Sequence, residues 1–282
     1  MSYTTLIDAA TLKAHLGHPD WVVIDCRFSL SDAQAGQRAY RDSHLPDARY
    51  AHLDADLSGP INPATGRHPL PDPARLASTL GNWGIGPETQ VVAYDDLGGM
   101  LAAARLWWLL RWLGHTACAV LDGGFPVWRA ADLPLTAALP TTPARSFTGQ
   151  PDDRLWLTTA QVQTLPAEAL LLDARTTVRF RGELEPIDPV AGHIPGALNL
   201  PTEGNLAATG RFLPLAALKE RFTAILGARA PHTVVHSCGS GITACHNLLA
   251  MEAAGLPGSR LYVGSWSEWI RNPDRPTATG EA

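Results

Sequence analysis

The feature that most constrains the fold is an internal duplication. Short motifs of the first half recur in the same order in the second half: residues 21–27 as 170–175, 44–48 as 193–197, 90–95 as 233–238, and 121–128 as 261–269. Each repeated unit is longer than about 100 residues, which is the size of a domain and not of a solenoid repeat. The sequence therefore predicts two tandem domains, residues 1–140 and 151–282, joined by a linker at residues 141–150 within a proline- and threonine-rich stretch.

Each half alternates short apolar runs with longer amphipathic ones. The short runs are typical of buried strands and cover residues 22–24, 90–94, 117–121, 170–172, 233–236 and 260–263. The longer runs predict helices at residues 4–16, 73–83, 99–113, 158–163, 214–226 and 242–254. Strands that alternate with helices favour an α/β fold in which each domain is a mainly parallel sheet flanked by helices.

Composition and charge exclude several function classes. The net charge is −5 and no run of Lys or Arg occurs, which argues against a nucleic-acid partner. The most apolar stretch, residues 100–113, contains two arginines and is too short to span a membrane. The N-terminus lacks the pattern of a secretory signal, so we expect a cytoplasmic protein. The four cysteines have no metal-ligand spacing, and we expect neither a metal nor an organic cofactor.

One cysteine stands at a position suited to chemistry. Cys238 follows a predicted strand, and residues 239–243 (Gly-Ser-Gly-Ile-Thr) lead directly into a predicted helix. A thiol there would lie against backbone N–H groups and a helix N-terminus, which favour the nucleophilic thiolate. Gly239 and Gly241 would let the backbone curl into an anion-binding nest. The first half carries Asp95 at the matching position, and a carboxylate cannot replace the thiol nucleophile, so only the second half is expected to be active.

These motifs resemble the rhodanese superfamily along nearly the whole chain. The resemblance rests on the repeated His-[Ile/Leu]-Pro-x-Ala motif, the glycine–tryptophan motif near the end of each half, and the cysteine loop in the second half alone. Within the superfamily the chain is most similar to the two-domain thiosulfate and 3-mercaptopyruvate sulfurtransferases. The neutral Cys-Gly-Ser-Gly-Ile-Thr loop is of the mercaptopyruvate type, whereas thiosulfate-specific members typically carry a basic loop.

The resemblance also implies roles for individual residues. Ser240, with His68 and Asp54 of the first half, would form a relay that moves the proton released from the donor. Residues 239 and 241–243 (Gly239, Gly241, Ile242 and Thr243) would line the substrate site, and Arg179 would bind the donor carboxylate. The family's second substrate arginine is missing from residues 185–189, and Arg181 is a possible substitute.

The implied function is transfer of a sulfane sulfur from 3-mercaptopyruvate, through a Cys238 persulfide, to an acceptor such as cyanide, a small thiol or thioredoxin. Transfer from thiosulfate to cyanide by the same persulfide is the alternative. A phosphatase or arsenate reductase of the Cys-x5-Arg type would need an arginine where Ala244 stands. A non-enzymatic binding module would not need the intact cysteine loop.

Overall fold

The computed structural model describes residues 2–141 and 143–281. Two compact units make up the chain. The first contains the residues up to Gly59 together with Pro71–Asp152 and Ala207–Phe212, and the second contains Pro60–Leu70, Asp153–Leu206 and the residues from Leu213 onward. Each unit therefore includes a short segment from the other half of the sequence, and residues 60–70 belong to the second unit.

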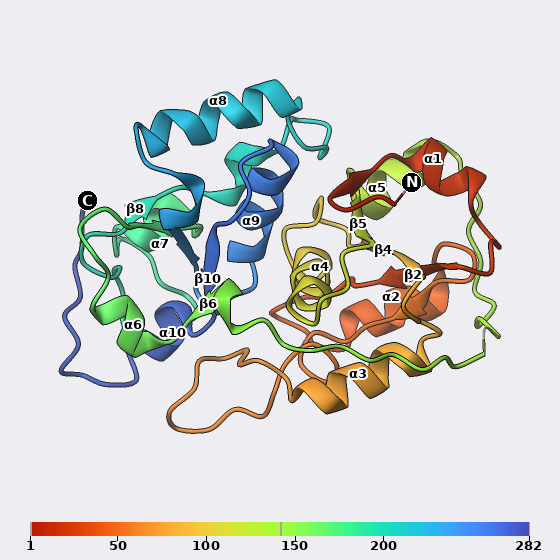
Figure 1. Cartoon of the computed structure of the whole chain (residues 1–282), viewed down its shortest axis with the longest axis horizontal. Helices are drawn as coiled ribbons and strands as arrows, with labels where there is room; N and C mark the ends of the chain where they lie inside the picture. The colour runs from red at the N-terminus through yellow and green to blue at the C-terminus, as the bar shows by residue number, and fades with distance from the viewer. Residues whose placement is uncertain (1, 142, 282) are drawn as a thin grey trace. The chain divides into compact units, whose positions relative to one another are not determined.

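The first unit is built on a five-stranded parallel sheet in the order β1-β5-β4-β2-β3 (Figure 1). Its strands are β1 (Leu6–Ile7), β2 (Trp21–Asp25), β3 (Arg49–Tyr50), β4 (Gln90–Tyr94) and β5 (Cys118–Leu121). Its helices are α1 (Ala9–Ala14), α2 (Ala35–Asp42), α3 (Pro73–Asn82), α4 (Ala102–Trp112) and α5 (Gly124–Ala130).

The second unit repeats this topology, with a parallel sheet in the order β6-β10-β9-β7-β8 (Figure 1). Its strands are β6 (Trp156–Leu157), β7 (Leu170–Asp173), β8 (Leu198–Asn199), β9 (Val234–Ser237) and β10 (Arg260–Tyr262). Its α-helices are α6 (Thr159–Gln163), α7 (Thr177–Phe180), α8 (Leu215–Leu226), α9 (Ala244–Ala253) and α10 (Ser265–Trp269). Short 3₁₀ helices η1 (Asp153–Leu155), η2 (Thr202–Asn205) and η3 (Pro231–Thr233) connect them.

Every residue of the central strands β4 and β9 is buried. Parallel strands covered by helices on both faces have this burial pattern, and it explains why these segments are almost continuously apolar. The α/β fold and the duplication expected from the sequence are confirmed.

The predicted helix at residues 4–16 is wrong at its start. Leu6–Ile7 forms strand β1, which pairs with β5, and helix α1 begins only after Asp8. The Asp8 side chain accepts a hydrogen bond from the Thr11 N–H, which caps the helix. A two-residue strand has too little sequence to show a periodicity of its own, so β1, β3, β6 and β8 were all beyond prediction by pattern.

Asp95 explains why helix α4 begins later than predicted. Its buried carboxylate accepts hydrogen bonds from the N–H groups of Leu97, Gly99, Leu101 and Ala103, at 2.7–3.4 Å. These bonds hold the backbone in a loop up to the start of the helix. Burial raises the pKa of Asp95 to about 6, while the bonds from Gly99, Leu97 and Leu101 act in the opposite direction. In the first unit a carboxylate thus fills the nest at the place that matches Cys238.

The polar motifs that recur in both halves brace the fold. Arg27 pairs with Asp25 at 2.6 Å, and Arg175 pairs with Asp173 at 2.7 Å. His193 Nδ1 lies 2.8 Å from the Phe180 carbonyl oxygen, and its ring stacks on the Phe180 ring. These buried contacts give a structural reason for polar residues that recur in both halves.

Candidate active site

In the loop after β9, the Cys238 sulfur accepts a backbone hydrogen bond. The Gly241 N–H donates to the Cys238 sulfur at 3.1 Å, and the Cys238 N–H donates to Ser265 Oγ at 3.0 Å. The cysteine is 2% exposed. A backbone N–H that donates to sulfur stabilises negative charge on that sulfur, so this contact suits a sulfur nucleophile.

Gly241 makes this geometry possible. Its φ of +77° lies in the left-handed region, and a Cβ atom at this position would lie 2.4 Å from the Val263 carbonyl oxygen. Only glycine can satisfy both conditions without moving the backbone. Helix α9 begins at Ala244, directly after this turn, with Thr243 at its N-cap.

Ser240 and His68 meet beside the cysteine. Ser240 Oγ lies 2.8 Å from His68 Nδ1, although the two residues are 172 positions apart in the sequence. Both side chains are buried. His68 lies in the segment 60–70, which packs in the second unit. A hydroxyl bonded to an imidazole can exchange a proton with a reacting group, so the pair is suited to acid–base chemistry.

Arg179, on helix α7, is held by a carboxylate network. Its guanidinium bonds both oxygens of Glu185 at 2.8–3.1 Å and also reaches Asp188 Oδ2 at 3.1 Å. The Glu185 carboxylate accepts the N–H groups of Ile187 and Asp188, each at 3.0 Å, which fixes the turn that carries Asp188.

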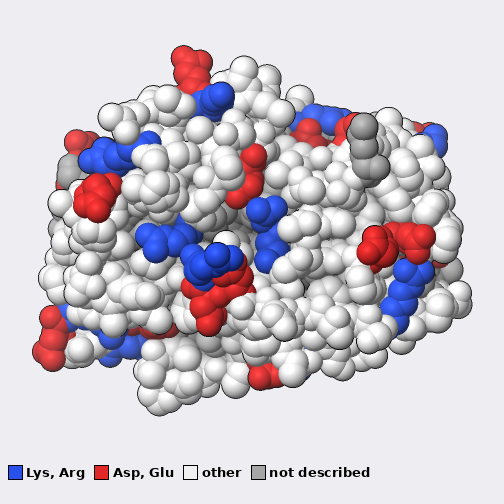
Figure 2. Space-filling view, viewed as in Figure 1, with Lys and Arg blue, Asp and Glu red and all other residues white. Residues whose placement is uncertain are grey.

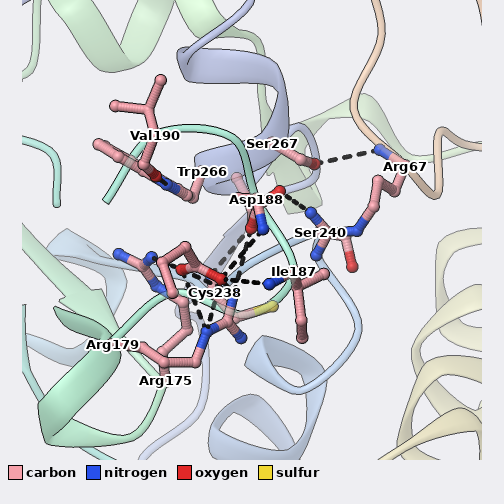
Figure 3. Close-up of polar contacts among 12 residues, drawn as sticks. Arg67, Arg175, Arg179, Ile187, Asp188, Val190, Cys238, Ser240, Trp266 and Ser267 are labelled. Carbon is pink, nitrogen blue, oxygen red and sulfur yellow. Dashed lines mark hydrogen bonds and ion pairs between the residues drawn. The ribbon is translucent and has the colours of Figure 1, made fainter. Parts of the chain in front are cut away.

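Arg67 carries no sequence signal that would mark it as a site residue. Its guanidinium pairs with Asp188, and its backbone N–H donates to Ser267 Oγ at 3.1 Å (Figure 3). A Cβ atom on Gly239 would lie 2.9 Å from Arg67 Nη2 and 3.5 Å from Arg179 Nη2. Two guanidinium groups therefore lie over the backbone next to Cys238. Burial lowers the pKa of Arg67, and the Cys238 thiolate opposes that shift.

Contacts of other predicted site residues are as follows. Asp54 belongs to the first unit, where its N–H donates to His52 Nδ1 at 3.1 Å. Arg181 forms ion pairs with Glu183 at 3.8 Å and Glu281 at 2.5 Å. The Ile242 carbonyl accepts the Cys245 N–H, at the entrance to α9.

Two broader properties bear on function. Across residues 2–141 and 143–281, no helix is long and apolar enough to cross a membrane, and no three His, Cys, Asp or Glu side chains are grouped to hold a metal ion. Figure 2 shows basic and acidic side chains in small mixed groups on the face that it draws.

The model of the rhodanese-like domain matches the chain twice, at residues 8–131 and 158–272. This chain belongs to the rhodanese family of sulfurtransferases. Both copies of the domain are present, and the second contains the Cys238 loop.

Individual rhodanese relatives resemble the chain over its full length. It is 51% identical to a probable 3-mercaptopyruvate sulfurtransferase of Pseudomonas aeruginosa, with 100% of both chains covered. It is 38% identical to a putative thiosulfate sulfurtransferase of Mycobacterium tuberculosis, with 98% of both covered. Among solved structures, the 3-mercaptopyruvate sulfurtransferase of Leishmania major superposes with a TM-score of 0.83 at 31% identity, over 96% of this chain and 76% of that one.

His236, two residues before Cys238, makes the stability of this rhodanese depend on pH. Burial lowers its pKa from 6.5 to about 3, and its Nδ1 has no hydrogen-bond partner among the described residues. Because the folded state binds the proton more weakly than the unfolded state, His236 contributes stability that is present above pH 6.5 and is lost as the pH falls toward 3.

Between pH 6.5 and about 3, we therefore expect the unfolding free energy of the wild type to fall by about 1.4 kcal/mol more per pH unit than that of His236→Leu. Urea unfolding at pH values on either side of 6.5 measures the difference. His232→Gln, at an exposed position of the same unit, serves as the control and should keep the wild-type dependence. Equal slopes for the wild type and His236→Leu would contradict the prediction.

Proposed function

We propose that this protein transfers a sulfane sulfur from 3-mercaptopyruvate to a nucleophilic acceptor through a persulfide on Cys238. The observation that carries the proposal is the hydrogen bond from the Gly241 N–H to the Cys238 sulfur, with the Ser240–His68 pair beside it. Together they provide an anion-stabilising nest for sulfur and a group that exchanges protons.

In the first half-reaction the Cys238 thiolate attacks the sulfur of the donor. The carbon–sulfur bond breaks, and the carbon fragment leaves as the enolate of pyruvate. The thiol proton of the donor ends on the methyl carbon, so one thiolate and one mercaptopyruvate give one persulfide anion and one pyruvate. Ser240 and His68 are assigned the transfer of that proton, and Arg179 is assigned to the donor carboxylate. The expected part of Asp54 in this relay stays a prediction.

In the second half-reaction an acceptor attacks the outer sulfur of the persulfide. The sulfur–sulfur bond breaks and the Cys238 thiolate is released. Cyanide would leave as thiocyanate, and a thiol, whether small or that of thioredoxin, would leave as a persulfide. Both outcomes return the protein to its starting state without a cofactor.

Thiosulfate is the alternative donor, and it would release sulfite from the same persulfide. The P. aeruginosa relative is named for mercaptopyruvate and the M. tuberculosis relative for thiosulfate. The loop itself favours mercaptopyruvate because its side chains between Cys238 and the helix include two hydroxyl groups and no cation. The kcat/KM values for the two donors, measured side by side with cyanide as acceptor, decide which donor is preferred. A higher kcat/KM for thiosulfate would make thiosulfate the preferred donor.

Mass spectrometry tests the persulfide directly. After treatment with mercaptopyruvate in the absence of an acceptor, the intact protein should be heavier by one sulfur atom, about 32 Da, and peptide mapping should place this mass on Cys238. Addition of cyanide should remove it. Turnover without any added mass on Cys238, under conditions that trap a persulfide, would rule out the proposed intermediate.

A further inference from the structure

The cluster beside Cys238 contains as many carboxylates as guanidinium groups. Arg175 pairs with Asp173 and Glu185, Arg179 pairs with Glu185 and Asp188, and Arg67 pairs with Asp188. Three positive and three negative side chains give a formal sum of zero. The negative charge of a Cys238 thiolate is therefore not offset by a net positive site.

Asp188 is the residue that links the two arginines over Gly239. Its side chain is 2% exposed, and its two oxygens face different guanidinium groups, Oδ1 toward Arg67 and Oδ2 toward Arg179. Figure 3 shows Asp188 in contact with Arg67, which comes from the segment 60–70, while Arg179 comes from helix α7. A buried carboxylate in this position holds both guanidinium groups and neutralises one of their charges.

A cavity beside the cluster has room for a small anion. It has a volume of about 290 Å³, and its walls include Arg67, Arg271, Asp188, Ser267 and the apolar side chains of Ile187 and Ile270. The side chain of Arg67 lines this space and is 24% exposed.

We propose that Arg67 is the second donor-binding guanidinium of the site, and that Asp188 sets the selectivity for donor charge by positioning Arg67 and cancelling one positive charge. The site then favours a donor with a single carboxylate over a dianion. This inference rests on the proposed function, because it concerns the donor that reacts with Cys238.

The physical basis is the charge that each donor brings next to the thiolate. A mercaptopyruvate molecule carries one negative charge, and its carboxylate can accept a fork of bonds from Arg67 and Arg179. Thiosulfate carries two negative charges, and a neutral cluster does not compensate the second. Interactions between charges a few ångströms apart in a partly buried site are strong enough to change a ratio of specificity constants about tenfold or more.

The first test is Asp188→Asn, which keeps the shape and removes the charge. The ratio of kcat/KM for thiosulfate to kcat/KM for mercaptopyruvate should rise about tenfold or more. Asp274→Asn removes a carboxylate from an exposed position of the same unit and should leave the ratio unchanged. An unchanged ratio in a folded Asp188→Asn protein would overturn the selectivity role.

The second test concerns Arg67 and does not depend on the first variant being stable. Arg67→Gln should raise the KM for mercaptopyruvate about tenfold or more, with a smaller change in kcat, because a charged hydrogen bond to the donor is lost. Arg67→Lys should recover part of the loss, since it restores the charge but not the fork. The exposed Arg229→Gln is the matched control. A KM equal to that of the wild type in Arg67→Gln would overturn the binding role.

Persulfide formation separates this inference from the proposed function. If both donors still place sulfur on Cys238 while neither the donor ratio nor the KM responds to these variants, the inference alone is wrong. If the wild type forms no persulfide on Cys238 with either donor, the proposed function itself is wrong.

Discussion

Replacement of Cys238 by serine is expected to abolish sulfur transfer from both donors, with a loss in kcat/KM of at least about a thousandfold. A serine hydroxyl in the same nest is far less acidic than a thiol and cannot form a persulfide. Steady-state assays with mercaptopyruvate or thiosulfate and cyanide measure the effect, and the mass increase on residue 238 should disappear at the same time.

Cys118→Ala is the control for Cys238→Ser. Cys118 is buried in strand β5 of the first unit, and burial raises the pKa of its thiol well above the ordinary value. Burial likewise raises the pKa of Cys26, and the Asp25 charge adds to that shift. Neither thiol should react, so Cys118→Ala should retain sulfur transfer. Wild-type turnover in Cys238→Ser would show that the sulfur travels by another route.

Replacement of Gly241 by alanine is expected to lower kcat/KM about 100-fold or more while Cys238 is still present. The added methyl group would meet the Val263 carbonyl, and alanine resists the φ of +77°, so the turn must shift. That shift would move the Gly241 N–H away from the Cys238 sulfur, to which it donates a hydrogen bond at 3.1 Å. The rate of persulfide formation, followed by mass spectrometry over time, should fall with kcat/KM.

Gly255→Ala provides a closely matched control for Gly241→Ala. Gly255 follows helix α9 with a φ of +74°, and a Cβ atom there would meet nothing within 4 Å. Its replacement imposes a similar backbone strain, on the order of 1 kcal/mol, without a clash and away from the sulfur. It should lower stability slightly and leave transfer intact. Equal activities of the two variants would mean that the Gly241 turn does not support the chemistry.

The tandem architecture was predictable because it leaves local and repeated signals. Buried strands such as β4 and β9 are runs of apolar residues, and the cysteine loop stands between such a strand and a helix. The relation between Cys238 and Asp95 was also visible from the repeat, and the structure adds that the Asp95 carboxylate binds the loop N–H groups itself. The short strand β1 was not predictable, because its two residues are defined by pairing with β5 and by no pattern of their own.

The sequence by itself determined the duplicated α/β fold, the single cysteine loop and, through the family resemblance, His68 as a partner of Ser240. Only the tertiary structure identified Arg67, which pairs with Asp188 across 121 positions of the chain and reaches the backbone beside Cys238. Residues 185–189 lack the second arginine expected from the resemblance, and nothing in the sequence alone shows that an aspartate there pairs with a different arginine. The physical reason is that periodicity and turn propensity describe neighbours along the chain, whereas ion pairs of this kind depend on where the segment 60–70 packs.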